Sequence, residues 1–305
     1  MQRLVNRRTA LSRMAVLPFV TSQASLAGTP PSTLPKLGAL FSPGRLPKPI
    51  LPGVVAQRPP HARDFPAPLA ARDLTDGASG WSALGNNDVG DCVLACAAHL
   101  VQLAAWHATK TWIPVLDQEV VNAYYALTGW NPTSTVKDPG MFVNVGFDYA
   151  MRTGFSGHKL GGYYRSIYAP GDLRYGLDVH SMKRAGIERL LSGFGGAAVA
   201  IDLPVNAHNK PLGPWVEADV AGGSAGGHCI PIVAYDPAWL YCVTWGRIVK
   251  MDWAFLTATS REFYFAYAED WMTPSGSADL HYSRAEMADT LAYYEVGEYL
   301  QFMHG

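Results

Sequence analysis

The sequence predicts an α+β fold in which a mainly helical region precedes a mainly antiparallel β region. Residues 92–107 form an apolar segment rich in Ala and Leu and free of Gly and Pro, which is typical of a buried helix. Two further helical segments follow at residues 117–127 and 142–153, and the second ends before Gly154, a common C-cap residue. After residue 196 the pattern changes to short runs of β-branched and aromatic residues, which favour strands.

Four strands are expected in the second half of the chain, at residues 197–203, 228–235, 239–244 and 263–267. The turn Asp236-Pro237-Ala238 separates the second strand from the third, so these two strands are expected to form a hairpin. A polar connector at residues 170–182 and a helix at residues 181–193, with Gly193 as its stop, precede the first strand.

Three parts are expected along the chain. Residues 1–27 are predicted to be a signal peptide, and residues 28–75 a proline-rich extended segment. Residues 76–305 are predicted to form one folded domain, with a mainly helical lobe at residues 76–195 and a mainly β lobe at residues 196–305.

The N-terminus has the order of regions that defines a signal peptide. A basic start containing Arg7 and Arg8 precedes a short apolar run at residues 14–20, and small residues then lead to Ala27. The paired arginines resemble a twin-arginine signal. We therefore expect a periplasmic or secreted protein. The apolar run is too short to span a bilayer, and no membrane span is expected after the signal is cleaved.

Proline dominates the segment that follows the signal. Eleven of the 22 prolines lie between Pro30 and Pro68, and no helical or alternating pattern is present there. Such a segment favours extended, partly polyproline II backbone. It could be a linker, a strap across the domain or a propeptide-like cover. If it crosses the active-site cleft, it would occlude the site until it is removed.

Composition limits the possible functions. A chain of 305 residues with 49% hydrophobic and 16% charged residues can bury a substantial core. From Asp64 onward there are 15 basic and 25 acidic residues, which gives no electrostatic reason to expect nucleic-acid binding. The four cysteines have neither the spacing of a zinc site nor the density of a disulfide scaffold. No metal or cofactor is expected.

Cys92 is the strongest candidate for a catalytic residue. The polar, glycine-bearing loop at residues 85–91 places it in the first turn of a predicted helix, where N–H groups and the helix dipole favour a thiolate. Asp91, the expected N-cap, would oppose this effect if its carboxylate faced the sulfur. The alternative is a small apolar side chain packed in the core, which is our interpretation of Cys96.

His228 is the candidate base for this thiol. It follows the glycine-rich residues 222–227 and is expected to be the first residue of a strand. A nucleophilic thiol needs a base within hydrogen-bond reach, and a third group that fixes the base in one tautomer. His99 lies two helical turns from Cys92 and is too distant for this role. The alternative for His228 is an ordinary core or surface histidine.

Together these features resemble the papain-like cysteine peptidase family over residues 82–271. They are the helix headed by Cys92, the His228 strand, the hairpin after it and the pair Trp245-Gly246. More narrowly, the chain resembles a bacterial exported group with a Gly-Asp-Cys nucleophile loop. The resemblance implies an active site in the cleft between two lobes. It also implies cysteine-dependent hydrolysis of a peptide or amide substrate through an acyl-enzyme.

Two positions depart from the family pattern. The glutamine that helps to hold the oxyanion, six residues before the cysteine, is Asn86 here. The asparagine that orients the histidine corresponds to Val243 or Thr244, depending on the direction of counting, and only the Thr244 hydroxyl can accept a hydrogen bond. The predicted catalytic set is therefore Cys92, His228, Asn86 and Thr244. A catalytically silent binding protein and a transglutaminase-like acyl transferase remain as alternatives.

Overall fold

The computed structural model describes residues 34–41, 67–167, 184–273, 276–277, 283, 285–287 and 289, and all of them belong to the compact unit Thr33–Gly305. The predicted signal peptide, residues 28–33 and 42–66 of the proline-rich segment and the whole predicted connector lie outside the described residues. Residues 290–305 at the C-terminus lie outside them as well.

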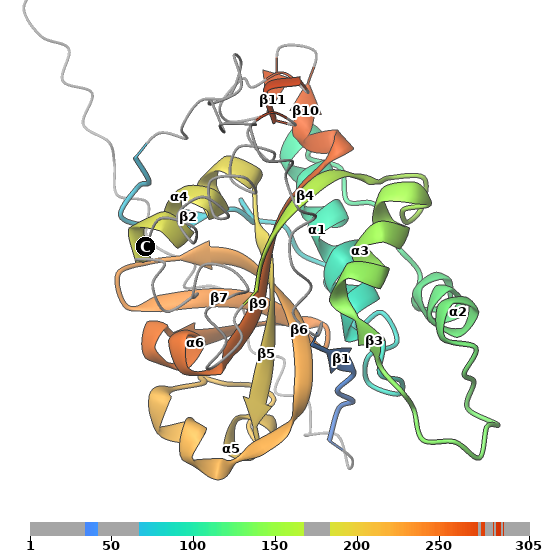
Figure 1. The fold of residues 1–305 in the computed structure, drawn as a ribbon. Helices are drawn as coiled ribbons and strands as arrows, with labels where there is room; N and C mark the ends of the chain where they lie inside the picture. Colours follow the sequence, from blue (N-terminus) through green and yellow to red (C-terminus); the bar gives the residue numbers. More distant parts are fainter. Residues whose placement is uncertain are drawn as a thin grey trace, which may run out of the picture. The chain divides into compact units, whose positions relative to one another are not determined.

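The three helices predicted for the first half of the chain are confirmed as α1 (Cys92–Thr109), α2 (Asp117–Thr128) and α3 (Val143–Arg152). Helix α1 is buried from its first residue to Ala105 because almost all of its side chains are small or apolar. It contacts β6 of the sheet on one side and helices α2 and α3 on the other (Figure 1). Its length and composition would also suit a membrane span, but 78% of it is buried inside the protein.

The seven strands of the main sheet in the described part of the chain pair in the order β4-β9-β5-β6-β7-β8, with β2 also paired to β6. Every pairing in this sheet is antiparallel, so the predicted α+β class is confirmed (Figure 1). The strands are β2 (Arg72–Asp73), β4 (Leu160–Ile167), β5 (Ala197–Pro204), β6 (Ser224–Tyr235), β7 (Trp239–Thr244), β8 (Arg247–Asp252) and β9 (Ser260–Ala268). Strand β4 lies within residues 76–195, where a mainly helical lobe was expected.

The glycine-rich approach to His228 is part of a strand rather than a loop. Strand β6 begins at Ser224, and both Gly226 and Gly227 pair with β5. The expectation that the strand begins at His228 is therefore wrong. Glycine is needed at 227 because a Cβ there would lie 1.9 Å from the backbone oxygen of Ala39, which crosses the strand at this point.

The structure also has α4 (Arg184–Phe194), α5 (Val205–His208), the 3-10 helices η1 (Glu217–Gly222) and η2 (Glu269–Trp271), α6 (Trp253–Thr259), β10 (Met272–Thr273) and β11 (Gly276–Ser277). Helix α4 precedes β5, and the other helices and strands of this group follow it. Helix α4 runs through Gly193, so the predicted stop there is wrong. The left-handed residue that follows the helix is Gly195, with φ 79°.

Residues 34–41, which we call the strap, are the part of the proline-rich segment that runs beside the predicted site. Strand β1 (Ala39–Leu40) lies within the strap and pairs in parallel with β3 (Met141–Phe142), just before α3 (Figure 1). The N–H of Gly38 donates to the oxygen of Gly227 on β6, at 3.1 Å. The strap therefore contacts both the helical segment and the sheet.

Candidate active site

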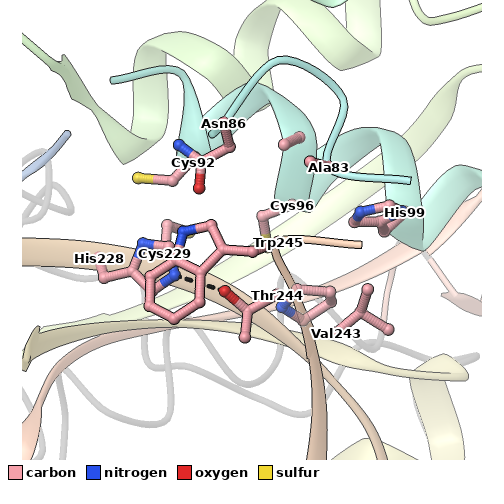
Figure 2. Close-up of a pocket in the computed structure, with 12 residues that line it drawn as sticks. Ala83, Asn86, Cys92, Cys96, His99, His228, Cys229, Val243, Thr244 and Trp245 are labelled. Carbon is pink, nitrogen blue, oxygen red and sulfur yellow. Dashed lines mark hydrogen bonds between the residues drawn. The ribbon is translucent and has the colours of Figure 1, made fainter. Parts of the chain in front are cut away.

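The four predicted site residues line one small pocket (Figure 2). Cys92 and Asn86 come from the head of α1 and the loop before it, whereas His228 and Thr244 come from β6 and β7. Figure 2 shows the first pair on the helical side of the pocket and the second pair on the sheet side. The structure thus brings together residues that lie as much as 158 positions apart in the sequence.

Cys92 is the first residue of α1 and is 1% exposed. Burial, and then the neighbouring Cys229 thiol, raise the pKa of Cys92. The backbone N–H groups of Cys229 and Gly38 lower the pKa, but to a smaller extent. In this state the thiol is therefore protonated, because burial outweighs the effect of the helix N-terminus that was expected to favour the thiolate.

Asp91 occupies the N-cap position of α1, but its side chain makes no capping hydrogen bond. The carboxyl group is fully buried, and neither of its oxygens has a hydrogen-bond partner among the described residues. Burial raises the pKa of Asp91 well above its ordinary value. Asp91 is also among the groups that raise the pKa of Cys92, which is the direction expected for a carboxylate that opposes a thiolate.

The ring of His228 is fixed on two sides. It stacks on Trp245, with ring centroids 4.7 Å apart and an interplanar angle of 17°, and its Nε2 lies 2.7 Å from Thr244 Oγ1 (Figure 2). Its Nδ1 is buried and has no partner in the described part of the chain. Burial, with a smaller effect from His208, lowers the pKa of His228 to about 3. The imidazole is thus neutral, with one nitrogen tethered and one free to accept a proton.

A two-residue hairpin turn positions both groups that hold this ring. Trp245 and Gly246 connect β7 to β8, and both have positive φ values, of 47° and 77°. Such a pair forms a type I′ turn, whose twist matches that of the flanking strands. The turn leaves Thr244 at the end of β7 and places the Trp245 indole over the imidazole.

Asn86 has a structural contact in the loop before α1. Its Nδ2 donates to the backbone oxygen of Val89 at 3.1 Å, and its own backbone oxygen accepts from the N–H of Lys36 at 3.2 Å. The side chain is 2% exposed. An amide nitrogen carries two hydrogens, and besides the bond to Val89 the Asn86 side chain is among the groups that lower the pKa of Asp91.

Asp138 fixes the loop that delivers Cys92, a role that the sequence did not indicate. The N–H of Gly90 donates to Asp138 Oδ2 at 2.7 Å, and the Tyr124 hydroxyl donates to the same carboxylate. The Tyr124 oxygen in turn accepts the N–H of Gly140 at 3.0 Å. We call Asp138 and Tyr124 the loop clamp, because they hold the loop before α1 to the segment before β3.

The sheet side of the pocket holds the first half of the strap by its backbone oxygens. His208 Nε2 lies 2.8 Å from the oxygen of Pro35, and Trp245 Nε1 donates to the oxygen of Lys36 at 3.4 Å. His208 was missed because its partner is 173 residues away, and no local pattern marks the contact.

The helical side holds the second half of the strap. The N–H of Met141 donates to the oxygen of Gly38 at 2.7 Å, which extends the pairing of β1 with β3. Together with the bond from Gly38 to Gly227, these contacts attach the strap to both sides of the pocket that contains Cys92. On the strap, backbone groups alone take part in these hydrogen bonds, so the bonds do not depend on the polarity of the strap side chains.

The other cysteines and His99 belong to the core. All four cysteines, which lie in the described part of the chain, are buried free thiols. His99 lines the pocket, but its Nδ1 is 3.0 Å from Gln102 Oε1 and its ring meets the edge of Trp81. Within the described residues, no three His, Cys, Asp or Glu side chains are grouped so that they could hold a metal ion.

The neutral state of His99 predicts a pH-dependent stability. Burial lowers the pKa of His99 to about 4, whereas an unfolded histidine titrates near 6.5. Below pH ~6.5 the unfolded chain binds the proton first, so the free energy of unfolding falls as the pH falls. Between pH 7.5 and 5.0 we expect the wild type to lose about 2 kcal/mol more than His99→Gln does.

Urea unfolding of both proteins at the two pH values measures this difference. The opposite shift at Asp91 is present in both proteins and cancels in the comparison. An equal loss in the two proteins would show that His99 is not held neutral in the folded state.

No protein-family model matches the sequence, and no curated protein is similar to it. Among solved structures, the chain is similar to xylellain, a cysteine protease from Xylella fastidiosa, at 13% identity and a TM-score of 0.46, covering 68% of this chain and 90% of that one. It is also similar to a cysteine protease from Carica candamarcensis (13% identity, TM-score 0.46, 65% and 98% covered) and to the bromelain protease from Ananas comosus (11%, 0.45, 65% and 99%).

Proposed function

We propose that this protein is an exported, papain-like cysteine hydrolase that cleaves peptide or amide bonds, with Cys92 as nucleophile and His228 as base. The observation that carries the proposal is the state of the His228 ring. Its Nε2 is tethered to Thr244, its Nδ1 has no partner among the described residues, and it shares a pocket with a cysteine at the head of a helix. A thiol nucleophile needs a base held in this way. The Gly-Asp-Cys loop and the signal-like N-terminus support membership of a bacterial exported group.

In the proposed reaction, His228 Nδ1 accepts the proton of the Cys92 thiol as the sulfur attacks the substrate carbonyl carbon. The oxyanion that forms receives hydrogen bonds from the Cys92 backbone N–H and from the second amide hydrogen of Asn86. His228 then gives its proton to the leaving amine as the C–N bond breaks. Water, deprotonated by the same ring, attacks the thioester, which releases the acid and restores the thiol.

The proposed resting state is self-occluded. The strap is hydrogen bonded on both sides of the pocket, and the paired groups beneath it are neutral and almost fully buried. A substrate therefore has to displace the strap, or enter after the strap is removed. Exposure to water then moves the pKa values of Cys92 and His228 back toward their ordinary ranges and allows proton transfer between them.

Thr244 acts through His228 in this proposal. In the tautomer that a base requires, Nε2–H donates to Thr244 Oγ1, which keeps Nδ1 unprotonated and facing the thiol. Replacing Thr244 by Val keeps the shape but leaves Nε2–H unpaired, at a cost of about 1–3 kcal/mol. We expect kcat to fall about 10- to 100-fold.

Thr244→Ser, which keeps the hydroxyl, is the matched control and is expected to retain most of kcat. The pH profile of kcat is measured for both variants, because a purely structural role would leave its acid limb unmoved. Equal losses in the Ser and Val variants would rule out a role for the hydroxyl.

A catalytically silent binding protein is the second candidate. The observation that favours it is that the strap fills the space next to Cys92 and that both reactive groups are neutral. The full chain with the strap released separates the candidates when it is incubated with gelatin, which carries glycine at every third position, and a fluorescent primary amine. New α-amino groups support the hydrolase, amine incorporation supports an acyl transferase, and neither product supports the silent protein.

A further inference from the structure

We infer that the groove filled by the strap accepts only glycine at the position beside Cys92, so that its substrates are extended peptide segments with a glycine there. This inference rests on the proposed function and names its substrate class. The strap stands in for the extended backbone of such a segment.

The fit of Gly38 against the nucleophile loop is the first support. A Cβ on Gly38 would lie 1.9 Å from the backbone oxygen of Gly90 and 2.6 Å from its Cα. Real Cβ atoms do not approach backbone so closely, and a backbone atom cannot turn away as a flexible side chain can. The φ of Gly38 is outside the left-handed region, so the requirement for glycine comes from space and not from backbone conformation.

Two further glycines complete the walls around the strap. A Cβ on Gly140 would lie 2.2 Å from the oxygen of Gly38, and a Cβ on Gly227 would lie 1.9 Å from the oxygen of Ala39. The walls thus come from the loop before α1, the segment before β3 and strand β6. We call the space bounded by Gly90, Gly140 and Gly227 the glycine slot.

The glycine slot lies at the proposed reacting groups. Gly90 is two residues before Cys92 and Gly227 is directly before His228. The N–H of Gly38 is close enough to the Cys92 sulfur to be among the groups that lower its pKa. A residue that takes the place of Gly38 therefore lies beside the thiol.

The loop clamp prevents the slot from widening. Asp138 accepts the N–H of Gly90, and Tyr124, which donates to Asp138, accepts the N–H of Gly140. The two walls are therefore tied to each other through buried or half-buried hydrogen bonds. Moving Gly90 to make room for a side chain would break a charge-assisted bond, so the slot excludes larger residues rather than adapting to them.

The neighbours of Gly38 define the sequence around the glycine. Leu37 is half-buried and contacts the hydrophobic core, and its Cδ1 would lie 3.4 Å from a Cβ on Gly226. Ala39 is 5% exposed, which leaves little room for a larger side chain. The preferred segment is thus an apolar residue, then glycine, then a small residue.

Two octapeptides test the slot. One has the sequence of residues 34–41, and the other has Ala in the place of Gly38. Each is added to the full chain carrying Gly38→Ala, in which the strap no longer fits, and the alkylation of Cys92 by iodoacetamide is followed by mass spectrometry of its peptide. We expect the glycine peptide at saturation to slow alkylation at least tenfold and the alanine peptide to have little effect.

If both peptides protected Cys92 from alkylation equally, or if neither peptide protected it, the proposed selectivity of the glycine slot would be wrong. His208→Ala, which weakens the strap at Pro35 without touching the slot walls, replaces Gly38→Ala if that variant does not fold. Fluorescence anisotropy of the labelled peptides measures their binding to the glycine slot directly, without any reaction at Cys92. If the protein bound the glycine peptide more tightly but Cys92 reacted no faster than Cys96, the glycine slot would be supported and the proposed hydrolase function would be wrong.

Discussion

Replacing Cys92 by alanine in the full chain with a released strap is expected to lower kcat/KM for peptide hydrolysis by at least about 10³-fold. The reason is geometric. Among the described residues, Cys92 is the thiol at the head of a helix in a pocket with a histidine nitrogen that has no partner. Without the sulfur, no covalent intermediate forms, and only direct attack by water remains.

Cys96→Ala is the matched control for this experiment. Cys96 lies one turn further along α1, is also 1% exposed and lines the same pocket. Its removal leaves a small cavity in the core, so the free energy of unfolding is expected to fall by about 1 kcal/mol while kcat/KM changes by less than about threefold. The release of α-amino groups from gelatin, which carries glycine at every third position, gives the rates. If Cys92→Ala retained the activity of Cys96→Ala, the assignment of the nucleophile would be wrong.

Replacing Gly38 by alanine is expected to open the site. The added methyl group would lie 1.9 Å from the oxygen of Gly90, in a slot whose walls are tied together by the loop clamp. Overpacking of this kind costs about 1–3 kcal/mol, which corresponds to a rise of about 5- to 150-fold in the open population. The rate at which iodoacetamide alkylates Cys92 is expected to rise by the same factor.

Lys36→Ala is the control for strap release. The Lys36 side chain is exposed, and the bonds of this residue to Asn86 and Trp245 use its backbone, so they survive the substitution. Alkylation of Cys92 in this variant is expected to match the wild type. A wild-type rate in Gly38→Ala, or an equal rise in Lys36→Ala, would contradict a closed strap held by the fit of glycine.

Much of the fold follows from local patterns in the sequence. The segment at residues 92–107 predicts a buried helix because it is apolar nearly all round, and the turn at Asp236 predicts the β6–β7 hairpin. Among the described strands of six or more residues, two were not predicted because their composition is unusual. Strand β4 (LGGYYRSI) contains two glycines and an arginine, and β8 (RIVKMD) carries charge at both ends. The pairing partners of these strands compensate for weak local propensity.

The site was predictable only in part. The residue types and loop context pointed to Cys92 and His228, and the register of the β7–β8 hairpin decides between Val243 and Thr244 for the position beside the imidazole. Counting along a sequence cannot make that decision, because successive side chains of a strand point to opposite faces and the count does not say which face meets the imidazole. Similarly, the sequence leaves Asp138 as either a cleft residue or a plain helix-end charge, and only folding brings the N–H of Gly90 to it.

The path of the strap is the feature that sequence could least define. Proline content predicted an extended segment, but linker, strap and cover remained equally consistent with it. The path depends on glycines from three other elements and on a histidine 173 residues away, and each of these is an unremarkable residue in its own segment. Their common role in fixing the path of the strap becomes visible only in the folded structure.

The central claim, that His228 activates Cys92, is tested most directly by the alkylation rate of Cys92 at pH 7 in Gly38→Ala with and without His228→Ala. We expect the loss of the imidazole to slow the reaction about 10- to 100-fold, because the thiol then ionises only near its free pKa of about 8.5. His99→Gln, a second histidine of the same pocket that is already bonded to Gln102, is the control and is expected to change nothing. Equal rates with and without His228 would contradict the account.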